Sequence, residues 1–305
     1  MIRVLVTGAR GQVGAEVARE LEGRAEVLAH DRATLDLAQP AQIAARIRAA
    51  RPDVIVNAAA YTAVDAAESD ADSARAVNAI APGVIAEEAK RASALLIHFS
   101  TDYVFDGRKS APYVEADATN PLGVYGRTKL EGERAVAASG CRHLILRTSW
   151  VYGPHGRNFL LTMLRLGATR RELRVVDDQR GAPTSSRCLA RLVRELLDRD
   201  GDMDAIQRAE VDQLGAASGL YHAAADGATT WFGFASAIFD EAARQGRLAA
   251  PAPQLVAIAT RDYPTPAKRP ANSVLSSARL ESAFGVRIPE WRRGLEETVS
   301  ALPGG

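Results

Sequence analysis

The chain has 305 residues, of which 47% are hydrophobic, and 38 Lys and Arg against 37 Asp and Glu leave a formal net charge of +1. This length and composition fit one large or two unequal domains and exclude a disordered chain or a simple repeat array. The balanced charge leaves no excess positive field for nucleic acid or for an anionic membrane surface, so neither is expected as a partner.

Short β-branched and leucine-rich runs alternate with longer helical patterns along the first half of the chain. The expected strands are Ile2–Val6, Glu26–Ala29, Val54–Val56, Leu95–Phe99 and Leu144–Leu146. The expected helices between them are Gln12–Leu21, Gln39–Ala50 and Ala74–Ala92, where apolar residues recur at three- and four-residue spacing. Strands that are apolar at successive positions are typical of a parallel sheet covered on both faces. The pattern therefore predicts a doubly wound α/β fold of the Rossmann type.

Beyond about residue 155 this alternation weakens, with loops expected at 200–219, 251–253 and 263–270. We expect a dinucleotide-binding domain over 1–155 and a smaller mixed domain over 156–305 that mainly binds substrate. Residues 173–176 and 187–197 resemble a strand and a helix, and both are expected to return to the main sheet.

The first expected strand runs directly into a glycine-rich turn that opens the first helix, with glycines at Gly8, Gly11 and Gly14. Glycine allows the backbone to turn tightly and to approach a ligand, and the free N–H groups of the helix N-terminus stabilise a pyrophosphate. Three glycines in seven residues also occur in ordinary strand-to-helix turns. Asp31 strengthens the nucleotide interpretation, because it follows the second strand at the distance expected of the carboxylate that binds the adenosine ribose; the alternative is a turn or cap residue.

Charge near that ribose determines which nicotinamide cofactor is used. Asp31 favours NADH, since a carboxylate repels a 2′-phosphate. Arg32 and Arg10 lie close in sequence to Asp31 and to the glycine turn, and a guanidinium pairs with phosphate. The sequence therefore predicts use of both NADH and NADPH.

Tyr125 and Lys129 lie four residues apart at the start of a helical segment, which places both side chains on one face. The chain has only four lysines, so a chance match is a weak explanation. A nearby ammonium is expected to lower the pKa of the phenol, which makes Tyr125 a usable acid. Thr101, at the end of a central strand, is the third candidate, because its hydroxyl can hydrogen-bond a substrate carbonyl; capping a turn is the competing role.

The two cysteines, Cys141 and Cys188, show no CxxC spacing and no neighbouring His pair, so neither a disulfide framework nor a zinc site is expected. The apolar run after Met1 is too short for a signal peptide, and no 18-residue apolar stretch exists to span a bilayer. A cytoplasmic protein is expected.

These motifs together resemble the extended short-chain dehydrogenase/reductase superfamily. The resemblance rests on the glycine turn, on Asn57-Ala58-Ala59-Ala60, on residues 100–105 and on Tyr125-x-x-x-Lys129. It narrows to the dTDP-4-dehydrorhamnose reductase family through the stretches 59–65, 147–152, 178–184 and 269–273, and it covers residues 1 to about 295.

The resemblance implies NADPH- or NADH-dependent reduction of the C4 keto group of dTDP-4-dehydro-L-rhamnose to dTDP-L-rhamnose. It implies that Thr101, Tyr125 and Lys129 are catalytic and that Thr101, Asp102 and Trp150 face the dTDP-sugar; ordinary core packing is the alternative for Trp150. The residues implied to hold the cofactor are Gly8, Gly11, Gln12, Val13, Gly14, Asp31, Asp36, Leu37, Ala60, Tyr61 and Thr62, together with Tyr125 and Lys129.

Two rival functions remain open. A sugar-nucleotide dehydratase or epimerase of the same superfamily returns the hydride to the substrate, but a dehydratase usually follows the Thr with Asp-Glu, and here Asp102 is followed by Tyr103. A regulatory binding subunit of the same fold would not need catalytic residues. The presence of Thr101, Tyr125 and Lys129 in this chain argues against that function.

The resemblance also implies a homodimer, and some relatives are described as dimers joined through metal ions held by acidic side chains. Glu16 matches one such acid, but the stretch 183–188 carries Arg187 and no acid. We therefore expect no metal ligands, and a magnesium-bridged dimer is not supported by the sequence.

Overall fold

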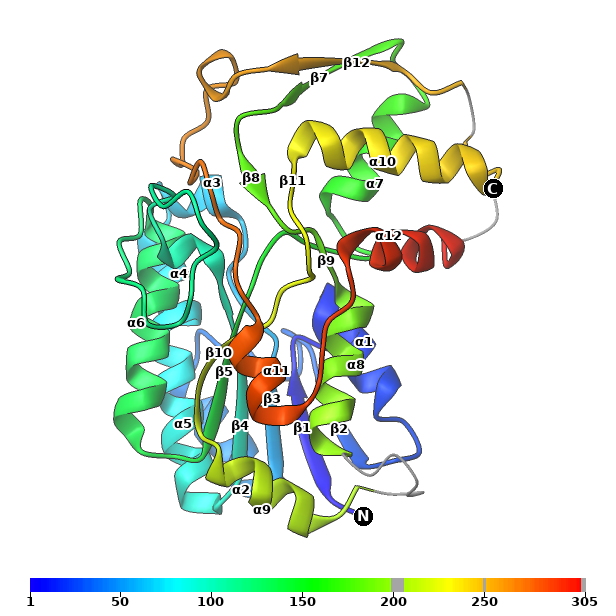
Figure 1. Cartoon of the computed structure of the whole chain (residues 1–305). Helices are drawn as coiled ribbons and strands as arrows, with labels where there is room; N and C mark the ends of the chain where they lie inside the picture. Colours follow the sequence, from blue (N-terminus) through cyan, green and yellow to red (C-terminus); the bar gives the residue numbers. More distant parts are fainter. Residues whose placement is uncertain (199–205, 249–250, 303–305) are drawn as a thin grey trace.

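A computed structural model describes residues 1–198, 206–248 and 251–302. Six parallel strands form the central sheet, in the order β10-β5-β4-β3-β1-β2 (Figure 1). The strands are β1 (Arg3–Thr7), β2 (Glu26–His30), β3 (Val54–Asn57), β4 (Leu95–Thr101), β5 (His143–Thr148) and β10 (Gly219–His222). The expected doubly wound parallel sheet is confirmed.

Both faces of this sheet are buried, because alternate residues of each strand enter different apolar clusters. Val4 and Val6 of β1 belong to one cluster with Val17 of α1 and Leu189 of α8, whereas Leu5 belongs to the other cluster, with helices α2, α5 and α6. The covering helices are α1 (Gln12–Glu20), α2 (Pro40–Ala50), α5 (Ala81–Ala92), α6 (Val124–Ser139), α8 (Ser186–Leu197) and α9 (Arg208–Ala216). Successive apolar residues in the strands follow from this two-sided burial.

The helix expected over 74–92 is divided into α4 (Ala71–Arg75), a π-helical turn η1 (Ala76–Ile80) and α5. This region packs closely on α6, since a Cβ on Gly132 would lie 2.1 Å from the Asn78 carbonyl oxygen. A π-turn inside a helix is often found near a functional site. Here it places Asn78 beside the helix that carries Tyr125 and Lys129.

The later part of the chain builds three two-stranded sheets above the carboxyl ends of the main strands (Figure 1). They are β6 (Val151–Tyr152) with β9 (Thr184–Ser185), β8 (Arg180–Gly181) with β11 (Thr229–Thr230), and β7 (Glu172–Val176) with β12 (Gln254–Ile258). The accompanying helices are α7 (Phe159–Gly167), α10 (Trp231–Arg244) and α12 (Trp291–Ser300). Shorter elements are α3 (Val64–Ala67), η2 (Asp102–Val104), η3 (Thr260–Asp262) and α11 (Ala278–Phe284).

Two expectations for the second half are wrong. The strand at 172–176 pairs with β12 and does not join the main sheet; β10 takes the edge position beside β5 instead. The loop expected at 200–219 contains helix α9 and the start of β10, while 199–205 lie outside the described residues. The helix at 186–197 does return to the main sheet, where it packs against α1. Within the described ranges, no helix is both long and apolar enough to cross a membrane.

Candidate active site

The glycine turn between β1 and α1 requires glycine at two positions. Gly8 has φ +69°, and a Cβ on Gly14 would lie 2.3 Å from the Gly8 carbonyl oxygen. Gly11 caps α1 without a side chain, so the first N–H groups of the helix receive no side-chain acceptor from it. Gln12 accepts a hydrogen bond from Asn158 at 2.9 Å, and Val13 packs against the core. The turn therefore presents backbone donors and a helix N-terminus, which suits a pyrophosphate.

Asp31 lies beside this turn, directly after β2. Its Oδ1 accepts from the backbone N–H groups of Ala33 and Thr34, and its Oδ2 pairs with Arg10 Nε at 2.8 Å. The Thr34 backbone hydrogen bond is the main reason that the pKa of Asp31 is lowered, and Arg10 adds to the effect. Asp31 is thus both a turn residue and a carboxylate at the edge of the glycine turn.

The other residues expected around the adenosine lie on the same loop. Asp36 Oδ1 accepts from the Ala38 N–H at 3.0 Å, and the Leu37 side chain is buried in the cluster under α2. Arg32 is exposed. The structure therefore brings Asp31 and Arg10 together, whereas Arg32 forms no ion pair with the residues that the structure describes.

The segment Ala60–Thr62 follows β3 and is tied to η1 and α6. The Tyr61 N–H donates to Asn78 Oδ1 at 2.9 Å, and Asn78 Nδ2 donates both to the Tyr61 carbonyl and to Thr128 Oγ1. Thr128 directly precedes Lys129. Asn78 was not predicted from the sequence to be functional. A polar Asn within an apolar helical stretch could have indicated it, because a buried amide needs hydrogen-bond partners, and Asn78 is buried.

Thr101, Tyr125 and Lys129 meet where β4 ends. Thr101 closes β4, and its hydroxyl oxygen accepts from the Tyr103 N–H at 3.2 Å. The Tyr125 phenol on α6 lies beside Thr101, whose hydroxyl partly offsets the rise in the pKa of that phenol. One helical turn further, the buried Lys129 Nζ donates to the Phe99 carbonyl oxygen at 2.6 Å. The three side chains expected to be catalytic therefore lie close together at the carboxyl end of β4.

The pKa of Tyr125 shifts in the opposite direction from the one expected from the sequence. Burial of the phenol raises the pKa of Tyr125 to about 12, and the Asp102 charge acts in the same direction. Burial also lowers the pKa of Lys129 to about 8. The expected lowering of the tyrosine pKa is wrong for this structure, because the phenol is desolvated and the ammonium is directed at Phe99.

Asp102 begins η2 and is almost completely buried. Thr101 Oγ1 donates to its Oδ1 at 3.0 Å, while Oδ2 makes no hydrogen bond of good geometry. Burial raises the pKa of Asp102 to about 6, an effect that the nearby Ser273 and Thr101 hydroxyls partly offset. Unpartnered buried carboxylate oxygens are uncommon, which marks this residue as a candidate functional group.

Trp150 follows β5, whose last residue, Thr148, is the register partner of Thr101. Its backbone is left-handed, with φ +47°, which is costly for a bulky residue. The indole stacks on Trp231 at the start of α10, with ring centroids 3.6 Å apart and planes 4° apart. A Cβ on Gly181 would lie 2.3 Å from the Trp150 ring. Trp231 was not predicted, because this stack depends on residues 81 positions apart in the sequence.

The stretch 265–273 closes the site from the C-terminal side. Arg269 pairs with Asp65 of α3 at 2.7 Å and also interacts with the Tyr103 phenol. The backbone here passes close to the η2 region, since a Cβ on Gly107 would lie 2.5 Å from the Ala271 nitrogen. Residues from both halves of the chain therefore surround Thr101 and Tyr125.

The surroundings of Glu16 do not suit a metal ion. This buried carboxylate on α1 is paired with Arg19, lies 3.7 Å from Arg187 Nε and 3.6 Å from His155 Nδ1. Two guanidinium groups already balance its charge and would repel a divalent cation. Among residues 1–198, 206–248 and 251–302, no group of three or more His, Cys, Asp or Glu could hold a metal.

Known proteins resemble this chain over nearly its whole length. Residues 2–303 match the family described as the RmlD substrate binding domain. The chain is 48% identical to a dTDP-4-dehydrorhamnose reductase of Burkholderia thailandensis over 294 residues, which cover 95% of this chain and 96% of that one.

Two solved structures have the same fold over nearly the whole chain. A dTDP-4-dehydrorhamnose reductase of Clostridium acetobutylicum has a TM-score of 0.86 at 37% identity and covers 98% of this chain and 99% of that one. A dTDP-4-dehydrorhamnose reductase of Bacillus anthracis, solved in complex with NADP, has a TM-score of 0.87 at 32% identity, with coverage of 97% and 98%.

Proposed function

The chain belongs to the RmlD substrate binding domain family, and from that premise we propose that it reduces the C4 keto group of dTDP-4-dehydro-L-rhamnose to give dTDP-L-rhamnose, with NADPH or NADH as reductant. The observation that carries this proposal is the corner of Thr101, Tyr125 and Lys129 at the carboxyl end of β4. That edge of an open parallel sheet is where ligands bind. The reaction is a step of nucleotide-sugar biosynthesis.

The cofactor lies across the carboxyl edge from the glycine turn to α6. Its pyrophosphate meets the N–H groups at Gly11, Gln12 and Val13, and Gly8 and Gly14 allow the close approach. Asp31 binds the adenosine ribose, and Asp36 and Leu37 line the adenine. The residues on the nicotinamide side are Ala60, Tyr61 and Thr62. Bound reduced nicotinamide supplies the hydride that C4 receives.

Tyr125 is the acid of the reaction. It protonates the oxygen that gains negative charge as C4 is reduced, and Thr101 donates a hydrogen bond that orients the C4 carbonyl. The Lys129 ammonium holds the nicotinamide ribose and stabilises the Tyr125 phenolate. Since Lys129 is directed at the Phe99 carbonyl, these roles require it to exchange that partner for the ribose.

We assign the cofactor-binding part to residues 1–155 and the substrate-binding part mainly to 156–305, from which α8, α9 and β10 return to the main sheet. Asp102 and Trp150 face the sugar nucleotide. The strained backbone of Trp150 supports this role, because strain of this kind is found at ligand sites more often than in ordinary core.

The test is to mix the purified protein with dTDP-4-dehydro-L-rhamnose and each reduced nicotinamide, and to follow cofactor absorbance together with product identity. A reductase consumes one reduced cofactor for each dTDP-L-rhamnose formed. An epimerase or dehydratase changes the sugar without net loss of reduced cofactor, and a regulatory subunit gives neither change. Either of the last two results rejects the proposal.

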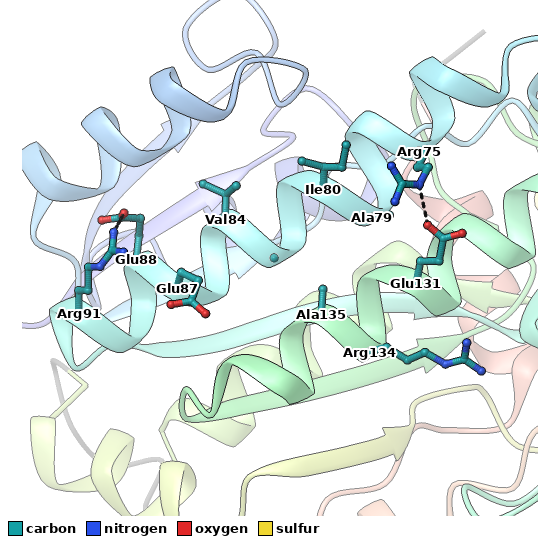
Figure 2. A pocket seen from close by; sticks show the side chains of 11 residues that line it. Arg75, Ala79, Ile80, Val84, Glu87, Glu88, Arg91, Glu131, Arg134 and Ala135 are labelled. Carbon is teal, nitrogen blue, oxygen red and sulfur yellow. Dashed lines mark hydrogen bonds and ion pairs between the residues drawn. The ribbon is translucent and has the colours of Figure 1, made fainter.

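The homodimer is also a proposal, and a groove between α5 and α6 supports it. Figure 2 shows Ile80, Val84 and Ala135 lining this groove, with charged side chains of both signs around them. Ile80 is 42% exposed. Because one surface carries both signs, two copies related by a two-fold axis can match opposite charges across it.

The oligomeric state in solution tests this assignment. Ile80→Glu should give a monomer by analytical ultracentrifugation, since it places a charge in the centre of the interface. Val114→Glu is the matched control, because Val114 is 40% exposed and lies outside the groove. A dimer that survives Ile80→Glu, or dissociates only when a chelator is added, contradicts the assignment.

A further inference from the structure

The indole of Trp150 is covered on both of its faces. One face stacks on Trp231, with ring centroids 3.6 Å apart and planes 4° apart. A Cβ built on Gly181 would lie 2.3 Å from Trp150 Cε2, 2.5 Å from Nε1 and 2.7 Å from Cζ2. A point beside the ring edge would be closer to Nε1 than to Cε2, so Gly181 lies above the ring. Because the stacked Trp231 leaves no room for backbone on its side, Gly181 covers the opposite face.

Trp231 is itself held in place by two other parts of the chain. Its Nε1 donates to Gln179 Oε1 at 3.1 Å, and the buried Gln179 donates from Nε2 to Thr260 Oγ1 at 3.0 Å. Phe159 of α7 packs on the Trp231 indole, with ring centroids 4.7 Å apart. Because both the N–H group and the ring have partners, Trp231 has little freedom to turn. It is therefore a fixed support for Trp150.

Since both faces of the Trp150 ring are covered, a ligand can reach only its edge. The side chain is half-buried, and no residue that the structure describes accepts a hydrogen bond from its Nε1–H group. An indole N–H is a donor only, so it suits an oxygen acceptor. Trp150 lies two residues after Thr148, the register partner of Thr101. This position places the indole at the sheet edge where the hexose is proposed to react.

We propose that Trp231 is a positioning residue for the sugar nucleotide. Together with Gly181 it holds the Trp150 indole so that the N–H at the ring edge donates to an oxygen of the hexose. The left-handed backbone of Trp150, with φ +47°, supports this role, because a bulky residue keeps such a conformation only where its surroundings hold it there. Stacking on Trp231 supplies part of that hold. The inference rests on the proposed reductase activity and adds to it a residue that acts through Trp150.

Trp231→Leu tests the proposal kinetically, because it removes the stack and keeps an apolar side chain. The KM for dTDP-4-dehydro-L-rhamnose should rise about tenfold and kcat should change by less than about threefold, since a binding contact is weakened and the reacting groups are kept. Trp231→Phe should restore most of the affinity, because a phenyl ring can still stack on Trp150. Trp291→Phe is the matched control, since Trp291 begins α12 outside this stack, and it should leave KM unchanged. An unchanged KM in Trp231→Leu overturns the proposal.

Calorimetric titration with two nucleotides shows which half of the substrate the indole meets. In Trp231→Leu the Kd of dTDP-L-rhamnose should rise about tenfold, because the contact to the hexose is weakened. The Kd of dTDP, which has no hexose, should stay within about twofold of the wild-type value. Equal weakening of both ligands would mean that the substitution disturbs the site as a whole, and it would overturn the proposal.

Nuclear magnetic resonance of the isotope-labelled protein reports on the indole N–H groups directly, because the chain has only three tryptophans. Trp150→Phe, Trp231→Phe and Trp291→Phe assign the three signals. Without ligand, the Trp150 signal should move in Trp231→Leu, since the ring current of the stacked indole is lost. Addition of dTDP-L-rhamnose to the wild type should move the Trp150 signal downfield, as a new hydrogen bond does, and should leave the Trp291 signal in place.

These measurements distinguish failure of the positioning role from failure of the proposed function. If the wild type reduces the sugar nucleotide but its Trp150 signal does not move on binding, the positioning role is wrong and the reductase function stands. If the wild type does not reduce the sugar nucleotide, the proposed function is rejected. A Trp150 signal that Trp231→Leu leaves unchanged rejects the positioning role whatever the activity.

Discussion

Lys129→Met is expected to stabilise the protein while it damages the proposed activity. The pKa of the buried Lys129 falls from 10.5 to about 8, which corresponds to about 3 kcal/mol of destabilisation when the ammonium is charged in the folded protein. The loss of a donor to the Phe99 carbonyl costs about 1 kcal/mol in the variant. The net gain at pH 7 is therefore about 2 kcal/mol in the free energy of unfolding.

The difference in stability between the wild type and Lys129→Met should change sign with pH. Below pH 8 both the folded and the unfolded protein carry the charge, so the full penalty is present in the wild type. Between pH 8 and 10.5 the unfolded state binds more protons at this group than the folded state, so the wild type gains stability relative to the variant. Above pH 10.5 the penalty has disappeared, and the variant should be the less stable protein.

Urea denaturation of both proteins from pH 7 to pH 11 measures this difference, with turnover and cofactor affinity measured alongside. Lys90→Met is the matched control, since Lys90 also donates to a backbone carbonyl, that of Ser139 at 2.8 Å, but is exposed to water. That control should show no gain in stability at pH 7. A Lys129→Met protein that is less stable than wild type at pH 7, or whose stability follows the same pH profile, would refute the reasoning.

Three further substitutions test other parts of the site. Tyr125→Phe should lower kcat by about 10² to 10⁴ with cofactor affinity retained, because only one hydroxyl is lost; near-normal turnover with bound cofactor contradicts the acid role. Asp31→Ala should shift the ratio of the kcat/KM values for NADPH and NADH about tenfold or more toward NADPH, because Arg10 is freed for a 2′-phosphate; an unchanged ratio places Asp31 away from the ribose. Glu133→Gln should lower the free energy of unfolding by about 3 kcal/mol or more in denaturation experiments, because it removes the carboxylate that lies 2.7 Å from the buried Arg147. A loss under about 1 kcal/mol would mean that water solvates this ion pair.

The first half of the fold was predictable because its signal is local. The strand Val54–Asn57 begins with three successive apolar residues, a pattern typical of a sheet covered on both faces. The glycine turn likewise requires glycine at Gly8 and Gly14. The second half lacks this signal. β7 finds its partner β12 about 80 residues later, and β10 is a four-residue edge strand, so neither pairing follows from local pattern.

The candidate site also contains residues that local sequence spacing predicts and residues that only the packing of distant elements brings together. Tyr125 and Lys129 lie one helical turn apart, so the spacing alone places them together. The Trp150 and Trp231 stack joins β5 to α10, and the buried Glu133 and Arg147 pair joins α6 to β5, so both depend on how elements pack. Desolvation likewise depends on the complete fold, which is why the direction of the Tyr125 pKa shift was predicted wrongly from the neighbouring lysine alone.

The raised pKa of Tyr125 bears on the choice between reduction and the rival reactions. A ketone that accepts a hydride becomes an alkoxide, which is far more basic than a phenolate, so proton transfer from Tyr125 stays downhill even with a pKa of about 12. An epimerase or dehydratase begins instead by oxidising a sugar hydroxyl, and for this step the tyrosine must first be a phenolate that removes a proton. At neutral pH a phenol with this pKa is almost entirely protonated and is a poor starting base. The protonated phenol of Tyr125 in this structure is therefore the form that reduction needs at its start, since the tyrosine must donate a proton.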